Sequence, residues 1–309
     1  MPSNTISPSI DQGAKLVFQD SFYHLAQQTK SRLMASGAIK FLPSAGKTHN
    51  MARMGRVELT EVNTRNPDKQ FGDYNIDNRQ FTKRRFTKTV QIDAKYDINE
   101  LLKDPTSDIL MQLNSAKERM VDRIAVSAAV GAVLTGGPDT APTSTSAAAD
   151  GVLTVTATSG FVYSTVQAIT QNFINNDLGY SDFSGSTLCI TGKENTDLMG
   201  ETEFINNFYI SGKPVEKGVM DKAGAYKIEL FAGSVNGGST VTNPILPEGA
   251  STRSCVVLAP QAVAMAMEVA VMDVTKSTTK VNSWDITIDL WINAMRTEGV
   301  RVQIVTTTL

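Results

Sequence analysis

The chain has 309 residues, of which 41% are hydrophobic and 19% are charged, so it holds enough apolar material for a sizeable globular core. Its 29 basic and 31 acidic residues leave a formal net charge of -2 at pH 7, which excludes the strongly basic footprint of a dedicated nucleic-acid binder. The charged fraction lies below the usual value of about a quarter, and we expect much of the surface to meet protein.

Targeting and redox signals point to a cytoplasmic origin. The first five residues are polar and lack the basic start and apolar stretch of a signal peptide, so we expect no secretion. The most apolar stretch, residues 256–272, contains Glu268 and falls short of the roughly 20 apolar residues of a membrane helix, so we expect no membrane span. Cys189 and Cys255 lie in apolar runs typical of strands, which predicts buried thiols without a disulfide.

The N-terminal part of the chain combines a helical pattern with a long polar stretch. Apolar spacing predicts an amphipathic helix over residues 15–36, which Gly37 would end. Residues 39–79 are polar and broken by several prolines and glycines, with a strand predicted only near residues 56–62. A stretch so poor in apolar residues cannot offset its own ordering entropy, so we expect residues 39–79 to become ordered only against an adjacent subunit.

A strand and a long helix follow. Apolar and polar side chains alternate over residues 86–98, which predicts a half-buried strand. Asp104 suits the cap of a helix, Pro105 suits its first turn, and Gly136 would end it after about 45 Å. The predicted buried stripe comprises Ile109, Leu113, Ala116, Met120, Ile124 and Ala128. Arg119 and Asp122 are predicted on the solvated face of the same helix.

The second half of the chain reads as a compact α/β region after a Thr, Ser and Ala-rich connection at residues 138–151. The predicted elements are a helix at 161–175, a strand at 187–191, a helix from 193, strands at 227–231 and 254–258, and a helix from Pro260. The chain is predicted to end in a hairpin, with residues 284–292 and 300–304 as strands and residues 297–299 as the turn.

This order of elements resembles a known family. The most specific part is the run Phe81-Thr82-Lys83-Arg84-Arg85-Phe86, then Leu101-Leu102-Lys103-Asp104-Pro105, then Ala116-Lys117-Glu118-Arg119-Met120-Val121-Asp122-Arg123. Together with the arm, the polar loop and the terminal strands, this texture is similar to the major capsid proteins of tailed bacteriophages, over nearly the whole chain. The resemblance implies an α+β fold of the Hong Kong 97-type, with a peripheral sheet and a long spine helix.

The resemblance also implies a division of the chain and a set of partners. The expected parts are an N-terminal arm (1–38), an extended loop (39–85), a peripheral domain with the spine helix (86–151 and 271–309) and an axial domain (152–270). The function implied is a head shell around viral double-stranded DNA, built from hexamers and pentamers of this chain in the virion after synthesis in the host bacterial cytoplasm. The arm begins almost at once, so we expect a separate scaffolding protein, besides a portal protein and room for a decoration protein. DNA would be held without sequence specificity on the inner face, and no membrane is involved.

Charged residues around the extended loop are the candidates for contacts between subunits. They comprise Arg53, Arg56, Glu58, Glu61, Arg79, Lys83, Arg84 and Arg85. We expect basic and acidic members to pair within and between subunits, and a repeated head-to-tail contact of this kind closes rings and shells. The alternative is a solvated charged hairpin that contributes almost nothing, because an exposed ion pair is worth about 0–1 kcal/mol.

Motifs for chemistry are weak. Gly46-Lys47-Thr48 is similar to the end of a phosphate-binding loop, but the first glycine of that motif is replaced by Phe41. His24 and His49 lack metal-ligand spacing. We therefore predict no enzyme and no catalytic, cofactor-binding or metal-binding residues. Two alternatives stay open: the shell of an encapsulin-like bacterial nanocompartment, which resembles the same fold, and a soluble α/β enzyme with a pocket of convergent titratable groups.

Overall fold

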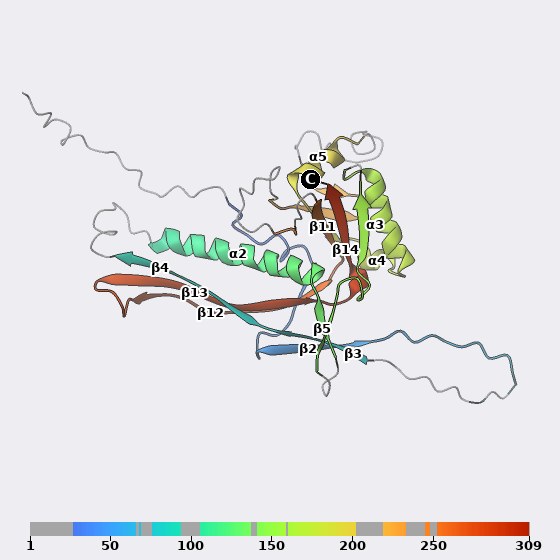
Figure 1. Cartoon of the computed structure of the whole chain (residues 1–309), viewed down its shortest axis with the longest axis horizontal. Helices are drawn as coiled ribbons and strands as arrows, with labels where there is room; N and C mark the ends of the chain where they lie inside the picture. Colours follow the sequence, from blue (N-terminus) through green and yellow to red (C-terminus); the bar gives the residue numbers. More distant parts are fainter. Residues whose placement is uncertain are drawn as a thin grey trace, which may run out of the picture.

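The computed structural model describes residues 27–65, 68, 76–93, 106–136, 141–158, 160–201, 219–232, 245–247 and 252–308. These residues form three sheets and four α-helices (Figure 1). One sheet carries a long helix across its face, a second forms a compact unit with three shorter helices, and a third, small sheet lies where a long hairpin leaves the body (Figure 1).

The first sheet has four strands in the order β1 (Ile39–Phe41), β12 (Val263–Lys276), β13 (Ser283–Arg296) and β4 (Arg84–Asp93). Strand β13 alternates apolar and polar side chains, so Ile286, Ile288 and Leu290 are buried on one face. Helix α2 (Thr106–Val130) covers that face (Figure 1). The predicted strand is thereby confirmed as far as Asp93, and its residues 94–98 lie outside the described residues.

Helix α2 is confirmed in kind but differs from its prediction in length and orientation. It ends at Val130, and its 25 residues span about 37 Å, because the chain turns into strand β5 (Val133–Thr135) before Gly136. Of the predicted buried stripe, Leu113 is buried, Ile109, Met120, Ile124 and Ala128 are partly buried and pack against the core, and Ala116 is exposed. The buried face runs instead through Leu113, Ser115, Val121, Asp122, Ala125, Val126 and Ala129. Asp122, predicted on the solvated face, is therefore completely buried.

The second sheet has six strands in the order β7 (Leu153–Ala157), β14 (Val302–Thr308), β11 (Thr252–Leu258), β8 (Thr187–Ile190), β10 (Tyr226–Leu230) and β9 (Lys222–Ala223). Helices α3 (Tyr163–Asn175), α4 (Tyr180–Phe183) and α5 (Gly192–Met199) belong to this unit. Helix α3 buries Ile169 and Phe173 in a core separate from that under α2. The predicted helices near 161–175 and 193 and the strands at 187–191, 227–231 and 254–258 are confirmed.

Two predictions for the C-terminal part are wrong. The residues after Pro260 form strand β12 and not a helix, because their long apolar run is covered on one face by α2 and fits a buried strand equally well. The terminal hairpin does not form either. Strand β13 pairs with β12 and β4, whereas β14 crosses through the short 3-10 helix η2 (Gly299–Arg301) to pair with β11 and β7.

This crossing bears on the predicted division of the chain. Residues 302–308 were assigned to the peripheral domain, but they hydrogen-bond inside the six-stranded sheet, together with residues of the predicted axial domain. Strand β12 likewise runs across the predicted boundary at residue 270 without a break in the four-stranded sheet. A short register irregularity between Val269 and Val271 is the only sign of that boundary in the strand pairing described.

The third sheet has the order β2 (Thr48–Met54), β3 (Ile76–Thr82), β5 and β6 (Thr143–Thr145). The predicted strand at 56–62 is wrong, since residues 55–65 have no regular structure, and the strand of this region is β2. The prediction that residues 39–79 find no surface on their own subunit is also wrong for the base of the loop, which pairs with β5 and β12. Residues 27–36 form no helix, and the rest of the predicted N-terminal helix lies outside the described residues.

The two cysteines agree with the expectation from the sequence. Cys189 and Cys255 are free and buried, and burial raises the pKa of both thiols. Across the described parts of the chain, no helix combines the length and apolar character needed to cross a membrane.

A buried ion pair holds helix α5 to the six-stranded sheet. Arg253 Nη1 lies 3.2 Å from Glu194 Oε1, and Thr307 Oγ1 donates to the same oxygen at 3.1 Å. The Thr191 amide donates to Glu194 Oε2 at 3.1 Å, which completes a capping box at the start of α5. Burial alone would raise the pKa of Glu194, but the hydrogen bond from Thr191, the charge of Arg253 and the bond from Thr307 together lower it.

We expect this carboxylate to make stability depend on acid pH. Because its folded pKa lies below the ordinary value of 4.5, the stabilisation is complete above that pH and is lost as pH falls toward the lowered pKa. Urea unfolding of the subunit between about pH 6 and pH 3 should show this loss, and Glu194→Gln should flatten the dependence while lowering stability at the upper end. Parallel pH profiles for the variant and the unaltered chain would contradict the assignment.

Candidate assembly interface

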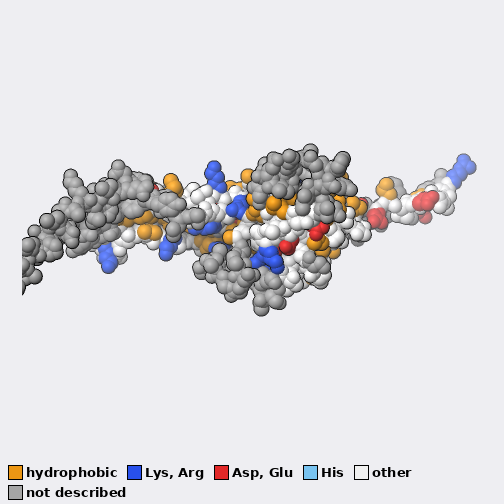
Figure 2. Space-filling view, turned by 90° about the horizontal axis from the view of Figure 1, so that it is seen from above, with side chains coloured by type: hydrophobic (Ala, Val, Ile, Leu, Met, Phe, Trp, Pro, Cys, Tyr) orange, Lys and Arg blue, Asp and Glu red, His pale blue; other side chains and the backbone are white. Residues whose placement is uncertain are grey.

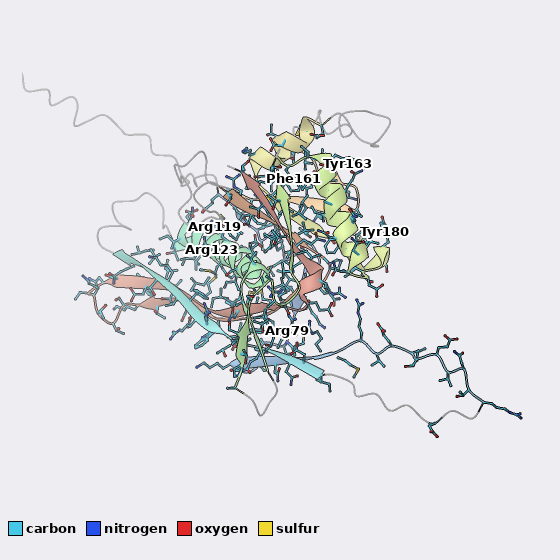
Figure 3. All side chains as sticks on the ribbon, turned by 45° about the vertical axis from the view of Figure 1, so that its right-hand side comes forward. Arg79, Arg119, Arg123, Phe161, Tyr163 and Tyr180 are labelled. Carbon is cyan, nitrogen blue, oxygen red and sulfur yellow. The ribbon has the colours of Figure 1, made fainter. Side chains whose placement is uncertain are left out.

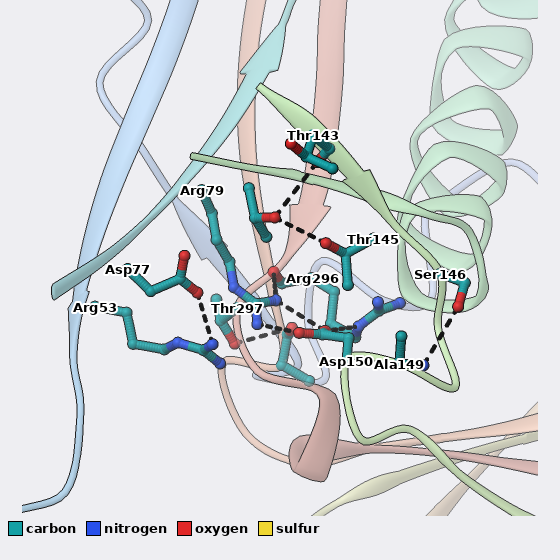
Figure 4. A network of polar contacts seen from close by, with 12 residues as sticks. Arg53, Asp77, Arg79, Thr143, Thr145, Ser146, Ala149, Asp150, Arg296 and Thr297 are labelled. Atoms are coloured by element: carbon teal, nitrogen blue, oxygen red, sulfur yellow. Dashed lines mark hydrogen bonds and ion pairs between the residues drawn. The ribbon is translucent and has the colours of Figure 1, made fainter. Parts of the chain in front are cut away.

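The extended loop is attached to the body by a buried cluster of two arginines and one aspartate (Figure 4). From β3, Arg79 Nη1 donates to Asp150 Oδ2 at 3.0 Å and to the Arg296 carbonyl at 2.9 Å, and its Nη2 binds Asp150 Oδ1. From the end of β13, Arg296 Nε donates to Asp150 Oδ2 at 2.7 Å. The Arg79 and Arg296 side chains are fully buried and Asp150 is 4% exposed, so one carboxylate joins two strands of different sheets.

The same cluster ends helix α2. Arg296 Nη1 donates to the carbonyls of Ala129 at 2.7 Å and Gly131 at 2.9 Å. A cation at this place satisfies carbonyls without helical partners and meets the negative end of the helix dipole. The helix end thus offsets part of the positive charge by which two arginines exceed one aspartate. Burial lowers the pKa of Arg296 and neighbouring Arg79 adds to this, while Asp150 opposes both.

The backbone around Asp150 is held as tightly as its side chain. A Cβ on Gly299 would lie 1.8 Å from the Asp150 carbonyl oxygen, so only glycine allows η2 to pass this close. The segment η2, which connects the four-stranded to the six-stranded sheet, therefore packs directly against the backbone of the turn that carries Asp150. The loop hairpin and the four-stranded sheet thus meet at the Asp150 carboxylate, the end of α2 is joined to it through Arg296, and the crossing segment packs against the backbone of Asp150.

Further along the hairpin the contacts become exposed. Arg53 on β2 pairs with Asp77 on β3 at 2.7 Å, which ties the two strands together. Arg56 reaches Asp177 at 2.9 Å and the Asn176 carbonyl at 3.3 Å, just past the end of α3. The Arg56 and Asp177 side chains are 67% and 83% exposed, so water screens this pair strongly and it holds the loop only weakly.

The basic residues 83–85 follow the hairpin, and they differ in burial: Lys83 is buried, whereas Arg84 and Arg85 are exposed. Lys83 is buried, donates to the Ser44 carbonyl at 2.5 Å and pairs with Glu268 at 2.6 Å. Arg85 pairs with Asp289 at 2.8 Å and lies 6.0 Å from the ring centre of Trp291. The hydrogen bond and charge of Asp289 raise the pKa of Arg85. Lys83 thus fastens the residue before β4 to β12, and Arg85 fastens β4 to β13.

Three of the eight predicted contact residues remain available to another subunit. Arg53, Arg56, Arg79, Lys83 and Arg85 all pair with an aspartate or glutamate of their own chain. Glu58, Glu61 and Arg84 are exposed, and their side chains make no hydrogen bond or ion pair with any residue the structure describes. Figure 2 shows the loop as a thin extension beyond the body that carries acidic and basic side chains.

Apolar side chains accompany these charges on the hairpin and the loop. The exposed ones are Met54 (68%), Val57 (71%), Leu59 (100%), Val62 (47%) and Ile76 (50%). Five such side chains on one narrow extension exceed the scatter expected of a solvated surface. Their own subunit supplies no core for them among the described residues, which is typical of a segment that is covered by a partner.

Sequence reasoning missed the residues that organise this region. Asp150 lies in the Thr, Ser and Ala-rich stretch that was interpreted only as a connection, and Arg296 lies at the end of an apolar strand. A lone aspartate in a charge-poor segment and an arginine after an apolar run are weak signals that a charge is buried. In the described part of the chain, no group of three or more histidines, cysteines or acidic residues is arranged to hold a metal ion.

Comparison with known proteins places the chain in a family. A family model described as phage capsid protein matches residues 10–308. The capsid protein of Ralstonia phage GP4 superposes with a TM-score of 0.66 at 12% identity, over 99% of this chain and 98% of that one. The acid-stable capsid of Helicobacter pylori bacteriophage KHP30 gives 0.67 at 9% identity, over 100% and 99%. The cyanophage P-SCSP1u capsid gives 0.64 at 12% identity, over 96% and 94%, and no curated protein sequence matches.

The buried cluster makes a sharp prediction about stability. Asp150→Asn keeps the size of the side chain but leaves two buried guanidinium groups without a counter-charge, so the free energy of unfolding should fall by about 3–5 kcal/mol. Asp177→Asn, which removes the exposed partner of Arg56, should lower it by less than about 1 kcal/mol. Urea unfolding of the unassembled subunit measures both, and equal midpoints for the two variants would refute a central role for Asp150.

Proposed function

Because this chain belongs to the phage capsid protein family, we propose that its extended loop joins neighbouring copies in the shell by reaching across the adjacent subunit. The chain is a structural major capsid protein, and copies of it build the icosahedral head shell of a bacteriophage. The observation that carries the proposal is the exposed loop of residues 55–65, whose apolar side chains and acidic groups find no cover on their own subunit within the described chain.

The direction of the loop supports a head-to-tail contact. The hairpin of β2 and β3 leaves the body beside the buried Arg79 and runs away from the four-stranded sheet (Figures 1 and 3). A contact made by a projecting loop on one copy and the body of the next is heterologous, since the two surfaces differ. Such contacts close into rings when the rotation between copies allows it, and joined rings make a shell.

Charge suggests where the loop docks. Arg84 and Lys88 lie on one face of β4, an edge strand of the four-stranded sheet, and both are exposed. Four residues along a strand cover about 13 Å, and three residues of an extended loop cover about 10 Å, so Glu58 and Glu61 of one copy can face these two cations of the next. Each exposed pair is worth only about 0–1 kcal/mol, but the contact recurs in every subunit of the ring.

The proposal extends to activity and to other partners. We propose that assembly is the only activity of the chain, because proteins of the phage capsid family are structural. We also propose synthesis in the host cytoplasm, a separate scaffolding protein, a portal protein, a place for a decoration protein, and DNA packaged without sequence recognition. The small net charge of -2 supports the last point. Membership of the phage capsid protein family favours a viral shell over the two alternatives, an encapsulin-like nanocompartment shell and a soluble α/β enzyme.

Charge reversal tests the docking of the loop. Glu58→Lys with Glu61→Lys should reduce the assembled fraction at least about tenfold, as should Arg84→Glu with Lys88→Glu, because like charges then face each other. All four changes together should restore assembly, since the contact is rebuilt with its signs exchanged. Sedimentation and negative-stain microscopy measure the assembled fraction, and Lys280→Glu, an exposed change elsewhere, is the control.

Two outcomes would reject this docking. Shells that form normally with either reversed pair would show that these charges do not face each other. Assembly that stays lost in the fourfold variant, while its subunits remain folded, would show that each pair contacts something else.

A further inference from the structure

A buried carboxylate on helix α2 binds the segment that leads into the first strand. Asp122 is completely buried. Its oxygens accept hydrogen bonds from the Ser31 hydroxyl at 2.5 Å, the Arg32 amide at 3.0 Å and the Leu33 amide at 3.2 Å, and also from the side-chain amide of Gln28. Successive backbone amides that converge on one anion form a tight binding turn. Within the described chain, every partner of this carboxylate comes from residues 28–33.

Neighbouring side chains of α2 extend the contact. Glu118 Oε2 accepts from the Ser31 amide at 3.2 Å. Arg119 Nη1 donates to Gln27 Oε1 at 2.7 Å and to the Gln28 carbonyl at 3.1 Å. Glu118, Arg119 and Asp122 lie within about one turn of the helix, and Figure 3 labels Arg119 on it. The helix therefore holds the backbone of this segment by polar contacts, and the buried side chain of Leu33 adds an apolar anchor.

The charge on Asp122 makes the contact hard to open. If residues 28–33 left α2, a buried carboxylate would lose all the donors described around it. By contrast, Thr29 and Lys30 in the same segment are exposed. Within residues 28–33, side chains that face solvent thus alternate with groups that face Asp122, as expected of an extended segment that contacts the helix on one side only.

We propose that Asp122 is a positioning residue for assembly, which latches residues 28–33 to α2 and so fixes the course of the described chain into β1 on the side of the subunit that neighbouring copies meet. The proposal rests on the shell function given above. Asp122 then does more than stabilise the fold, because it sets the direction of the segment that leads into β1. When this contact is loosened, subunits should still fold but should assemble into irregular or variable particles.

The test changes the segment of residues 28–33 and leaves the body of the subunit intact. Ser31→Asp places a second carboxylate beside Asp122, whereas Thr29→Asp adds the same charge at an exposed position two residues away. In the unassembled subunit, the rate of hydrogen exchange at the Arg32 and Leu33 amides should rise at least about tenfold in Ser31→Asp. This is the effect expected when one hydrogen bond to a charged group is lost. The rate should stay unchanged in Thr29→Asp. Asp122→Asn should also speed exchange, since the amide side chain carries no charge.

Three results decide the proposal. Fast exchange at Arg32 and Leu33 in Ser31→Asp, subunits that still unfold in one cooperative transition, and particles of uneven size by negative-stain microscopy would support it. Equal exchange in the two aspartate variants would overturn the latch, and fast exchange with particles of normal size and yield would overturn the positioning role. Because exchange is read in the free subunit, it is independent of shell formation. A failure of the proposed function would appear separately, as wild-type protein that forms no particles, and it would overturn the positioning role too.

Discussion

Two guanidinium groups share one carboxylate at the place where the extended loop leaves the body of the subunit. Removing three charges from water is costly, and the cost is met only because Asp150 binds both Arg79 and Arg296 and because the end of α2 supplies two carbonyls to Arg296. The remaining geometry depends on this cluster. It fixes the root of the hairpin, the end of the spine helix and, through Gly299, the crossing between the two larger sheets.

From that fixed root, burial falls steeply toward the tip of the loop. Arg79 is fully buried, the Arg53 pair is about one-third exposed, the Arg56 pair is mostly exposed, and Leu59 has no cover at all. A rigid base that carries a poorly covered tip is suited to reach a neighbour at a defined angle. The segment before β1 is held by hydrogen bonds to Asp122, and Leu33, Met34 and Ala38 add apolar contacts with the core. The extended loop and the segment before β1 are thus each held by a buried aspartate.

Local sequence patterns predicted many of the helices and strands but little of the strand pairing. The alternation of β4 and the apolar spacing of α3 are set by neighbours in sequence, and both elements were predicted correctly. The strand β12 was interpreted as a helix because an apolar run has no distinct period. The partners of β13 and β14 depend on contacts far apart in sequence, which no turn motif reports. Asp122 was predicted on the solvated face and Asp150 was missed for a related reason: a charged residue suggests solvent until its distant donors are known.

The most direct test of the account is a structure of the assembled shell at side-chain resolution by single-particle electron microscopy. The account predicts that residues 55–65 lie across the adjacent copy, with Val57 and Leu59 covered by it, while Arg79 and Arg296 still hold Asp150 inside their own subunit. A shell in which this loop folds back on its own body, or in which Arg79 leaves Asp150 for a neighbouring chain, would contradict it.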